Sequence, residues 1–456
     1  MNPKRHHGAV ALIDDRGELG FEELWALAGH MVKRIDECEP EGHVAFVAEP
    51  TREVVALLAG LVASGRLSVP LHPRSTASER EALLGRFQAP VRVVDPSGLA
   101  LGAHPSEPPR FVAASPHDPA VCLFTSGTSG RSRGVLLSRK ALEASVRAHC
   151  ENLPLGPGDR WLCPMPLAHA GGLMIGIRTL LQGATVVLLP RFEPGLVLEA
   201  VSEHRPAFLS LVPTMLRRLL GHPEHARLAS LRAILLGGAP LPTDLRKRAR
   251  ALGLAIKTTY GLTETASQIA TLGAGRDLSA SAVHVGAPLA GVEIELRDED
   301  GAAVATGKPG RVFMRGPMLM SGYLGEPPLS PDAWLETRDI GLLDAQGELS
   351  VLGRADETIL TGGENVHPAE VEAALLARAE VTDAVVFGAP DEEWGERVAC
   401  ALVLRPGAGD AERIVAQACR ELSRYKIPRK VVVLERFAEL ASGKVDRARV
   451  RREAMG

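Results

Sequence analysis

Short runs of β-branched and apolar residues alternate with helix-period segments from the N-terminus to about residue 350. Residues 43–48 (HVAFVA) predict a strand, residues 51–64 an amphipathic helix, and residues 67–70 the next strand. Strands that alternate with helices are typical of α/β proteins with parallel sheets. Further apolar runs of this kind lie at residues 91–95, 184–189, 208–212, 233–236 and 254–258. The sequence therefore predicts an α/β fold with largely parallel sheets.

Two changes of pattern divide the rest of the chain. After Gly286, closely spaced strands predict a smaller β-rich subdomain, with strands at residues 292–297, 311–314 and 348–352. From about Asp356 helices and strands mix again, and the expected elements are helix 368–379, strands 384–388 and 397–404, helix 411–424 and strand 430–434. We therefore predict an N-terminal domain over residues 1–355 and a small α+β C-terminal domain over residues 356–456.

The composition is that of an ordinary globular protein. Hydrophobic residues make up 45% of the 456 residues and charged residues 23%, which excludes a disordered or collagen-like chain. The net charge of −3 implies no broad basic surface, so we do not expect nucleic acid as a partner. No stretch approaches the ~18 consecutive apolar residues of a membrane-spanning helix.

The cysteines and the N-terminus indicate a reducing compartment. Six cysteines are scattered without a C-x-x-C pair, which favours free thiols over a disulfide frame or a zinc site. The opening residues MNPKRHHGAV are followed by acidic residues and not by the apolar core of a signal peptide. We therefore expect a cytoplasmic protein.

A string rich in glycine and hydroxyl residues, TSGTSGRSRG, lies at residues 125–134, after a strand-like run and before a helix that Ser138 can cap. Glycines let backbone N–H groups approach phosphate oxygens, and hydroxyl and guanidinium groups add donors. The string is not a Walker loop, and taken alone it also fits an ordinary Gly/Ser turn. The residues expected to contact a nucleotide phosphate are Thr125, Ser126, Gly127, Thr128, Ser129, Gly130 and Arg133.

This string resembles the T-S-G-[ST]-T-G-x-P-K-G phosphate loop of the adenylate-forming superfamily, which includes acyl- and aryl-CoA ligases, adenylation domains of peptide synthetases, and luciferases. Further motifs of that superfamily follow in order: YGLTE at 260–264, TRD at 337–339, GRAD at 353–356, GGENVHPAEVE at 362–372 and SGK at 442–444. The resemblance covers essentially the whole chain and is weakest near the N-terminus. It implies two α/β subdomains plus a β-subdomain, hinged at Asp356 to a small, mobile α+β domain.

The resemblance assigns nucleotide-binding roles by position. Glu264 is expected to ligate Mg²⁺ between ATP phosphates, since a hard cation prefers carboxylate oxygen. Asp339 and Arg354 are expected to bind the ribose hydroxyls, and Tyr260 to stack on adenine. Without the motif, a lone glutamate is more often a solvated charge and a lone tyrosine a core residue. The remaining positions implied around the nucleotide are Gly238, Ala239, Pro240, Thr259, Gly261 and Thr263.

Lys444 is the residue expected to catalyse the first half-reaction. A carboxylate that attacks the α-phosphate of ATP brings two anionic groups together, and a flexible ammonium can offset that charge. Without the S-G-K motif, Lys444 would be interpreted as a solvated lysine near the chain end. His169, in the stretch PLAHAGG, corresponds to the superfamily's gate histidine between the acyl pocket and the coenzyme A tunnel.

A second half-reaction with coenzyme A is implied by three residues near the C-terminus. Gly362 and Gly363 match glycines that line the pantetheine tunnel after the C-terminal domain rotates. Trp394 matches an often aromatic position that packs on the thiol arm, although a half-buried core tryptophan is an equal alternative.

Two residues depart from the superfamily pattern. Arg133 follows Ser132 where a Pro-Lys pair is usual, and its planar guanidinium binds phosphate as a fork instead of a point charge. Arg338 replaces a common glycine beside Asp339, and we expect its side chain to stay outside the nucleotide site.

The function implied is that of an acid–thiol ligase, which forms an acyl-adenylate from a carboxylic acid and ATP and then transfers the acyl group to coenzyme A. Acyl transfer to a carrier protein is less favoured, because Ala168 and Ala170 flank His169 where amino-acid adenylation domains place an aspartate. A luciferase-like oxygenation has no support. A non-catalytic nucleotide sensor is disfavoured by Glu264 and Lys444. No feature fixes the oligomeric state, and we allow for a homodimer.

The substrate expectation rests on the stretches 161–183, 210–220 and 233–242, which resemble o-succinylbenzoate–CoA ligases of menaquinone synthesis. Arg178 lies nine residues after His169, where those ligases tend to carry arginine, and a cation suits the second carboxylate of a diacid. Since 43 of the 52 basic residues are arginines, a structural arginine is an equal alternative. Other short aryl- or acyl-CoA ligases have similar motifs. The acyl pocket is expected to include Thr214, Gly238 and Thr259.

Overall fold

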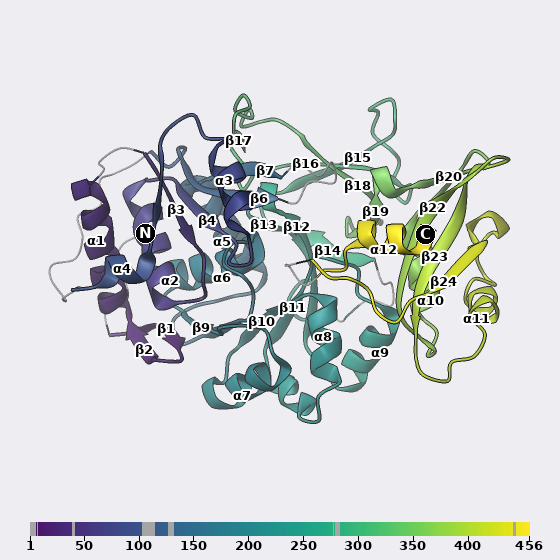
Figure 1. The fold of residues 1–456 in the computed structure, drawn as a ribbon, viewed down its shortest axis with the longest axis horizontal. Coiled ribbons are helices and arrows are strands. Elements are labelled where there is room, and N and C mark those ends of the chain that lie inside the picture. Colours follow the sequence, from purple (N-terminus) through teal and green to yellow (C-terminus); the bar gives the residue numbers. More distant parts are fainter. Residues whose placement is uncertain are drawn as a thin grey trace.

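The computed structural model describes residues 6, 8–38, 42–102, 115–125, 132–276, 278, 283–440 and 444–456. Within these ranges the strands form three sheets, two in a large N-terminal part and one in a smaller C-terminal part (Figure 1). This confirms the predicted α/β fold with a small α+β domain at its end. No helix in the described ranges is long and apolar enough to cross a membrane.

The first sheet has the strand order β17-β7-β6-β4-β3-β5. Strands β3, β4, β5 and β6 are parallel to their neighbours in this group, as predicted, while β7 and β17 extend the sheet antiparallel. The strands are β3 (His43–Val47), β4 (Ser68–Leu71), β5 (Val91–Val94), β6 (Pro119–Thr125), β7 (Arg133–Ser138) and β17 (Gly322–Tyr323). The phosphate-loop string thus connects β6 to β7.

Helices that pack on this sheet begin at polar caps. The helix predicted at residues 51–64 is α2 (Arg52–Ser64), which begins after Thr51, whose hydroxyl accepts from Val54 N. The expected cap Ser138 accepts from Ala141 N at the start of α5 (Arg139–Asn152). Both expectations are confirmed, because the side-chain oxygen satisfies an amide that the first helical turn leaves unpaired. The other helices here are α1 (Phe21–Cys38), α3 (Ala77–Leu84) and α4 (Pro96–Ala100).

The second sheet joins the second α/β region and the β-rich region into one surface. Its order is β15-β16-β18-β19-β14-β13-β12-β11-β10-β8-β9-β1-β2. The parallel half contains β8 (Arg160–Cys163), β9 (Thr185–Leu188), β10 (Phe208–Leu211), β11 (Ala233–Leu236) and β12 (Ile256–Leu262), with β1 (Val10–Asp14) and β2 (Gly17–Gly20) at its edge. Its helices are α6 (Ala170–Gln182), α7 (Pro194–His204), α8 (Pro213–Leu220) and α9 (Thr243–Ala251).

At strand β12 the sheet changes from parallel to antiparallel pairing, because β12 runs parallel to β11 and antiparallel to β13. The antiparallel half contains β13 (Ser267–Thr271), β14 (His284–Pro288), β15 (Glu293–Arg297), β16 (Gly310–Arg315), β18 (Leu335–Leu343) and β19 (Leu349–Arg354). The sequence predicted this β-rich region, but not that its strands continue the parallel sheet. Ligands of open α/β sheets bind beyond the carboxyl ends of the strands, so the end of β12 is a natural binding position.

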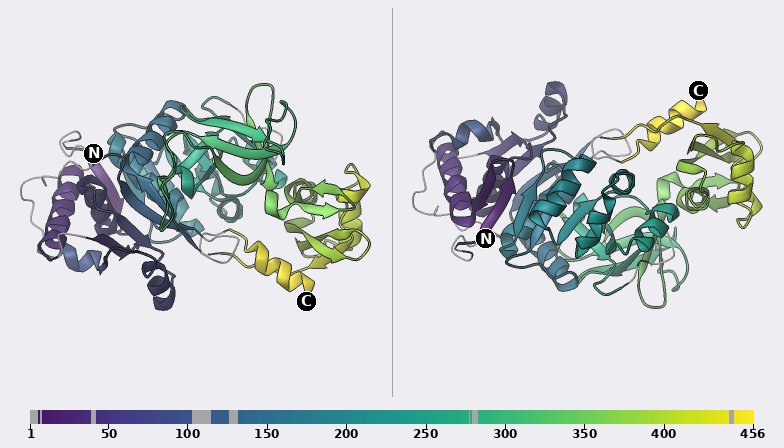
Figure 2. Two further views of the ribbon diagram at one scale, coloured as in Figure 1. Left: turned by 90° about the horizontal axis from the view of Figure 1, so that it is seen from above. Right: turned by 90° about the horizontal axis from the view of Figure 1, so that it is seen from below.

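The C-terminal part has its own sheet and core, and Figure 2 shows it as a separate unit beside the N-terminal part. The turn η4 (Ala355–Glu357) leads from β19 into β20 (Ile359–Thr361) and β21 (Glu364–Val366). The remaining strands are β22 (Val381–Asp391), β23 (Gly395–Leu404) and β24 (Lys430–Val433), and the helices are α10 (Pro368–Leu376), α11 (Ala411–Ala418) and α12 (Arg447–Met455). The expected helix 411–424 was too long, because the chain turns at the buried Cys419 to pack Leu422 on the core.

Candidate active site

A cavity of about 1060 Å³ opens at the carboxyl ends of β10, β11 and β12 and extends to β18, β19 and the segment before α12. Residues from the first sheet, the second sheet and the C-terminal part all line it. Those already expected from the sequence are Thr125, Arg133, His169, Arg178, Gly238, Thr259, Gly261, Thr263, Glu264, Arg354 and Lys444. One cavity therefore brings together motifs that are spread from residue 125 to residue 444.

The end of β12 is folded tightly around Glu264. A Cβ atom at Gly261 would overlap the carbonyl oxygen of Ser267, so a glycine is required there. Ala266 and Ser267 have φ values of +48° and +91°, which hold the chain in the left-handed region directly after the turn η3 (Thr263–Thr265). This backbone costs energy and fixes where the Glu264 side chain points.

Glu264 faces the cavity and is held by a tyrosine that the sequence analysis missed. The Tyr323 hydroxyl donates to Glu264 Oε1 at 3.0 Å. Burial, followed by the Glu264 charge, raises the pKa of Tyr323 to about 12, so the phenol keeps its proton. A carboxylate that lines a cavity together with Arg133 and Lys444 fits a Mg²⁺ ion that bridges ATP phosphates.

Asp339 on β18 lies opposite Arg354 on β19, in the antiparallel pairing of those strands. Arg354 Nη1 donates to Asp339 Oδ1 at 3.4 Å and to the carbonyl of Thr337 at 3.1 Å. The Tyr260 hydroxyl also donates to Asp339 through a short hydrogen bond. Burial raises the pKa of Asp339, while its hydrogen-bond donors oppose that rise. The three expected nucleotide residues thus form one connected cluster.

Lys444 reaches into the cavity beside the loop after β11. Gly238 has a φ of +84°, and a Cβ atom there would lie 2.7 Å from Lys444 Cε. The left-handed φ favours glycine at this position, and any other residue would also displace the end of the Lys444 side chain. The surrounding protein lowers the pKa of Lys444 by desolvation, which the charge of Asp339 partly offsets.

His169 stands at the N-terminus of α6 and faces His72, which follows β4 and was not singled out from the sequence. Their ring centroids are 5.1 Å apart, and the Nε2 atoms of both rings are buried without a hydrogen-bond partner in the described part of the chain. Burial lowers the pKa of His169 to about 4, with further contributions from His72 and Lys444. A neutral imidazole suits the expected role as a gate and not as a charged group.

Arg178 on α6 forms part of the cavity wall and is almost fully enclosed, with 2% of its surface exposed. Its Nε and Nη2 atoms have no hydrogen-bond partner among the described residues. The guanidinium carbon lies 5.7 Å from the centroid of the Trp161 ring. Burial lowers the pKa of Arg178 to about 10, so the side chain stays charged at neutral pH. A buried, charged guanidinium whose N–H donors lack partners is expected to bind an anion.

Two other residues of the cavity wall, Gln268 and Ser210, also present donors. Gln268 on β13 accepts a hydrogen bond from His149 Nδ1 through Oε1 at 2.8 Å and donates from Nε2 to Thr259 Oγ1 at 3.1 Å. Its oxygen thus already accepts one hydrogen bond, and one amide hydrogen remains. Ser210 Oγ accepts from Trp161 Nε1 at 3.1 Å, which leaves the Ser210 hydroxyl hydrogen free to donate. Neither Gln268 nor His149 carries a sequence signal, because they meet only through the fold.

Comparison with known proteins decides the family. The family model described as AMP-binding enzyme matches residues 1–324. The family model described as AMP-binding enzyme C-terminal domain matches residues 370–444. The chain belongs to the family of AMP-binding enzymes.

Individual members of this family cover nearly the whole chain. A 2-succinylbenzoate–CoA ligase of Bacillus velezensis is 33% identical over 99% of this chain and 95% of its own. A feruloyl-CoA synthase of an Amycolatopsis species is 32% identical over 91% of this chain and 89% of its own. The o-succinylbenzoate CoA synthetase of Bacillus subtilis, solved with the acyl-adenylate intermediate, has a TM-score of 0.85 and 31% identity over 97% of this chain and 95% of that one. The same protein has been solved with ATP and magnesium, at a TM-score of 0.83 and 30% identity over 97% and 96%.

Some residues expected in this AMP-binding enzyme lie outside the cavity wall. Thr214 is on α8, although Val212 from the preceding residues does line the cavity. Ala239 and Pro240 are exposed in the loop after Gly238. Tyr260 packs among apolar residues of the antiparallel strands. Their ligand contacts stay predictions, as do those of Ser126, Gly127, Thr128, Ser129 and Gly130, which lie outside the described residues.

The residues expected to contact coenzyme A lie in the C-terminal sheet, away from the cavity. Gly362 and Gly363 form the turn between β20 and β21, with φ values of +58° and +84°. Trp394 is 52% exposed, and a Cβ atom at Gly362 would lie 2.5 Å from its Cε3. The indole lies against the glycine turn and is not among the residues of the C-terminal core clusters, and its contact with the thiol arm stays a prediction.

The position of Arg338 differs from the expectation that its side chain stays outside the nucleotide site. The residue lines the cavity next to Thr337 and Arg354. It also has a φ of +62°, which explains why the family prefers glycine at this position. A non-glycine residue in this region costs about 1–2 kcal/mol.

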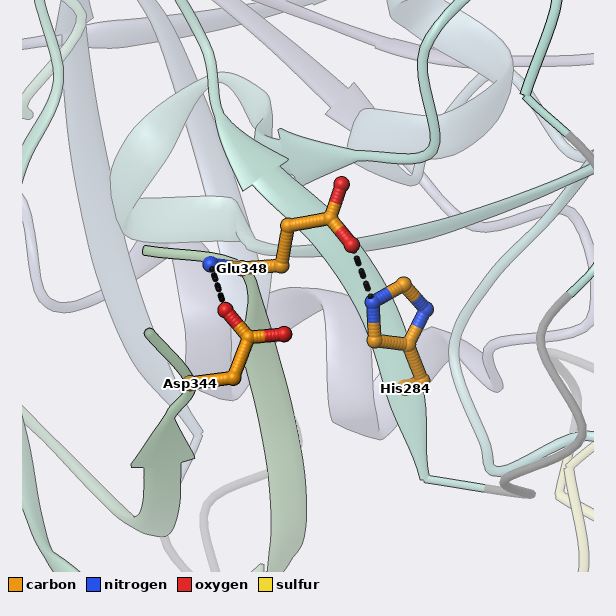
Figure 3. Close-up of side chains that lie close together, drawn as sticks. All are labelled: His284, Asp344 and Glu348. Carbon is orange, nitrogen blue, oxygen red and sulfur yellow. Dashed lines mark hydrogen bonds and ion pairs between the residues drawn. The ribbon is translucent and has the colours of Figure 1, made fainter. Parts of the chain in front are cut away.

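A group of potential metal ligands outside the cavity is already satisfied within the protein. His284 on β14 lies close to Asp344 and Glu348 of the turn between β18 and β19 (Figure 3). Glu348 bonds to His284 Nε2 at 3.0 Å and to Arg276 at 2.7 Å, while Asp344 Oδ1 accepts from Glu348 N at 2.8 Å. The charges and oxygens are used in joining β14 to β19, so this group carries no metal proposal.

Proposed function

We propose that this AMP-binding enzyme is a 2-succinylbenzoate–CoA ligase, which activates the acid with ATP and transfers the acyl group to coenzyme A. The observation that carries the proposal is the buried, unpartnered guanidinium of Arg178 in the cavity wall. A diacid offers one carboxylate for activation and a second that needs a cation. Similarity to ligases of that name supports the same substrate.

The second carboxylate has a matching set of donors. Arg178, the remaining amide hydrogen of Gln268 and the hydroxyl of Ser210 can all donate, and the oxygens of Gln268 and Ser210 each already accept one hydrogen bond. A neutral hydroxyl or methoxy group on the substrate would leave the guanidinium charge without a counter-ion, which is costly in a buried site. The set therefore favours a carboxylate at this end of the cavity.

At the other end of the cavity, Lys444 and Arg133 supply positive charge where the acid and the triphosphate meet. Lys444 stabilises the negative charge that develops as the carboxylate attacks the α-phosphate and pyrophosphate leaves. Asp339 and Arg354 orient the ribose, and Glu264 would hold the magnesium ion that neutralises the phosphates. His169 remains neutral and separates the acyl pocket from the path of the thiol.

The arrangement with Lys444 in the cavity suits the first half-reaction. Transfer to coenzyme A would use Gly362, Gly363 and Trp394, which lie outside the cavity in this arrangement. We infer that the C-terminal domain rotates about Asp356 between the two steps. A cytoplasmic location and a homodimeric assembly remain predictions of the sequence.

A different short aryl-CoA ligase is the second candidate, because a feruloyl-CoA synthase matches the chain almost equally well. The two are separated by carboxylate-dependent pyrophosphate exchange, followed by detection of the CoA thioester, with 2-succinylbenzoate, ferulate and an analogue of 2-succinylbenzoate without the ring carboxylate. We expect turnover of the diacid and a loss of ~10²-fold or more in kcat/KM for the analogue, the scale of losing bonds to a charged donor. Preference for ferulate or for the analogue would contradict the substrate assignment while leaving the CoA-ligase assignment intact.

A further inference from the structure

The segment that carries Tyr323 is fixed to the turn that carries Glu264. Met320 N donates to the Glu264 carbonyl at 2.8 Å, and β17 pairs antiparallel with β7 through Tyr323 and Val135. Leu324 N donates to the Gly134 carbonyl at 2.7 Å on the same edge. The backbone therefore holds the Tyr323 ring between the metal-site carboxylate and the end of the phosphate-loop string.

The Tyr323 side chain links two groups that are both expected to serve the triphosphate. Its hydroxyl donates to Glu264 Oε1 at 3.0 Å, and its ring is covered by the guanidinium of Arg133, whose central carbon lies 3.3 Å from the ring centroid. Arg133 is in turn bound by both carboxylate oxygens of Glu326 at 2.9 Å. The path Glu326–Arg133–Tyr323–Glu264 therefore joins the phosphate-loop cation to the metal-site carboxylate.

We propose that Tyr323 is a positioning residue for the magnesium-binding carboxylate: its hydroxyl holds one oxygen of Glu264 and directs the other toward the cation beside the ATP phosphates. This inference rests on the ATP-binding step of the proposed function and not on the identity of the acid. Carboxylates that ligate metals are generally held by hydrogen bonds from neighbouring residues, and removing such a partner typically lowers metal affinity ~10–100-fold.

The arginine that replaces the usual lysine gives this contact its particular geometry. A planar guanidinium can stack on an aromatic face while its edge donates to a carboxylate, and here Arg133 Nη2 donates to both oxygens of Glu326. Arg133 thus fixes the ring plane of Tyr323 from one side while the β17–β7 pairing fixes its backbone. The phenol is left with little freedom to turn away from Glu264.

The test measures ATP binding to the full-length protein by calorimetry, with and without Mg²⁺ and without any acid substrate. In Tyr323→Phe we expect the factor by which Mg²⁺ strengthens ATP binding to fall about tenfold, the loss typical of a missing partner to a metal-binding carboxylate. The metal-free ATP affinity should stay within twofold of wild type. Tyr425→Phe removes a hydroxyl from an exposed ring outside the cavity and serves as the matched control, with no change expected.

Three outcomes would overturn the proposal. These are an equal change in ATP affinity with and without Mg²⁺ in Tyr323→Phe, no change under either condition, and the same effect in Tyr425→Phe. Because no acid is present, the result does not depend on whether 2-succinylbenzoate is the substrate. Absence of 2-succinylbenzoate turnover in wild-type protein that still shows Mg²⁺-dependent ATP binding would reject the substrate assignment alone.

Discussion

Replacement of Arg178 by methionine is expected to stabilise the protein while it removes the binding site for the second carboxylate. Two nitrogen atoms of the buried guanidinium, Nε and Nη2, have no hydrogen-bond partner, and no counter-ion bonds to the group in the described structure. Burial lowers its pKa from the ordinary value of a guanidinium to about 10. At ~1.4 kcal/mol for each tenfold change in proton affinity, the protonated group costs the folded state roughly 3 kcal/mol.

The sign of this cost follows from the direction of the pKa change. Because the folded-state pKa lies below the unfolded value, the cost is fully present below pH 10 and is relieved only as the pH rises above about 10 toward the unfolded-state pKa. At neutral pH Arg178 is charged in both states, so the whole cost applies. Methionine has a similar length and no charge. It also forfeits the contact with the Trp161 ring, worth about 0.5–1 kcal/mol.

The balance predicts that Arg178→Met raises the free energy of unfolding by about 2 kcal/mol and the melting temperature of this 456-residue chain by roughly 2 °C. The same change should lower kcat/KM for 2-succinylbenzoate by ~10²-fold or more, because two charge-assisted hydrogen bonds are worth about 1.5–3 kcal/mol each. The KM for ATP should change less than twofold. Thermal unfolding without ligand and steady-state kinetics measure the two effects separately.

Two further variants serve as controls for this experiment. Arg420→Met removes a guanidinium that is largely exposed and pairs only with the neighbouring Glu421 among the described residues, so neither quantity should change. Arg178→Lys keeps the charge but loses the planar fork, and should retain part of the activity without gaining stability. A lower melting temperature in Arg178→Met, together with unchanged kcat/KM for the diacid, would refute the reasoning, since Arg178 would then be a structural residue.

Three other substitutions test the site and the hinge. Lys444→Ala should slow carboxylate-dependent pyrophosphate exchange by ~10²-fold or more while thioester formation from supplied acyl-adenylate survives, and equal loss of both activities would reject this role. Asp356→Pro should affect the two half-reactions unequally in single-turnover assays, because proline fixes φ near −65° in a turn that must change conformation; wild-type rates in both would place the hinge elsewhere. Arg338→Gly should raise stability by about 1 kcal/mol in denaturant unfolding by relieving the left-handed φ of +62°, and a loss of stability would show that the arginine makes a compensating contact.

The sequence predicted the parts of the fold that depend on local patterns. The strand at 43–48, the helix after Thr51 and the cap at Ser138 all follow from periodicity and capping chemistry within a few residues. The order of the sheet strands does not follow from such patterns, because it depends on packing between distant segments. The joining of the β-rich region to the parallel sheet at β12 was missed for that reason.

The same limit applies to the site. Glu264, Lys444 and Arg354 belong to motifs that a sequence displays directly, and the structure brings them to one cavity. Tyr323 lies 59 residues after Glu264, and no sequence motif predicts the hydrogen bond between them. His149 and Gln268 are 119 residues apart, and their hydrogen bond determines which amide atom faces the acyl pocket. Only the three-dimensional arrangement shows that the pocket offers donors to an anion.

The contacts of two consecutive residues support a division between the domains at the turn η4. Asp356 Oδ1 accepts from Arg354 Nε of the N-terminal domain at 3.4 Å. Glu357, the next residue, pairs with Arg447 on α12 at 3.1 Å, and Arg447 also binds Glu372 on α10 at 2.8 Å. Glu357 is therefore tied to the C-terminal core, so it should move with that domain while Asp356 absorbs the change in backbone angles.

An ion pair between the domains, which lies farther from this turn, is easier to break. Arg217 on α8 binds Asp244 on α9 at 3.1 Å and Asp383 on β22 at 3.7 Å. Burial raises the pKa of Asp383, the Arg217 charge offsets only part of this rise, and the nearby Asp244 charge adds to it, so the carboxylate is not fully stabilised where it lies. Separation of the domains would return Asp383 to water and leave Arg217 its stronger bond to Asp244. The ion pair between the domains would therefore oppose the proposed rotation only weakly, while the pair of Glu357 and Arg447 would keep the C-terminal domain intact.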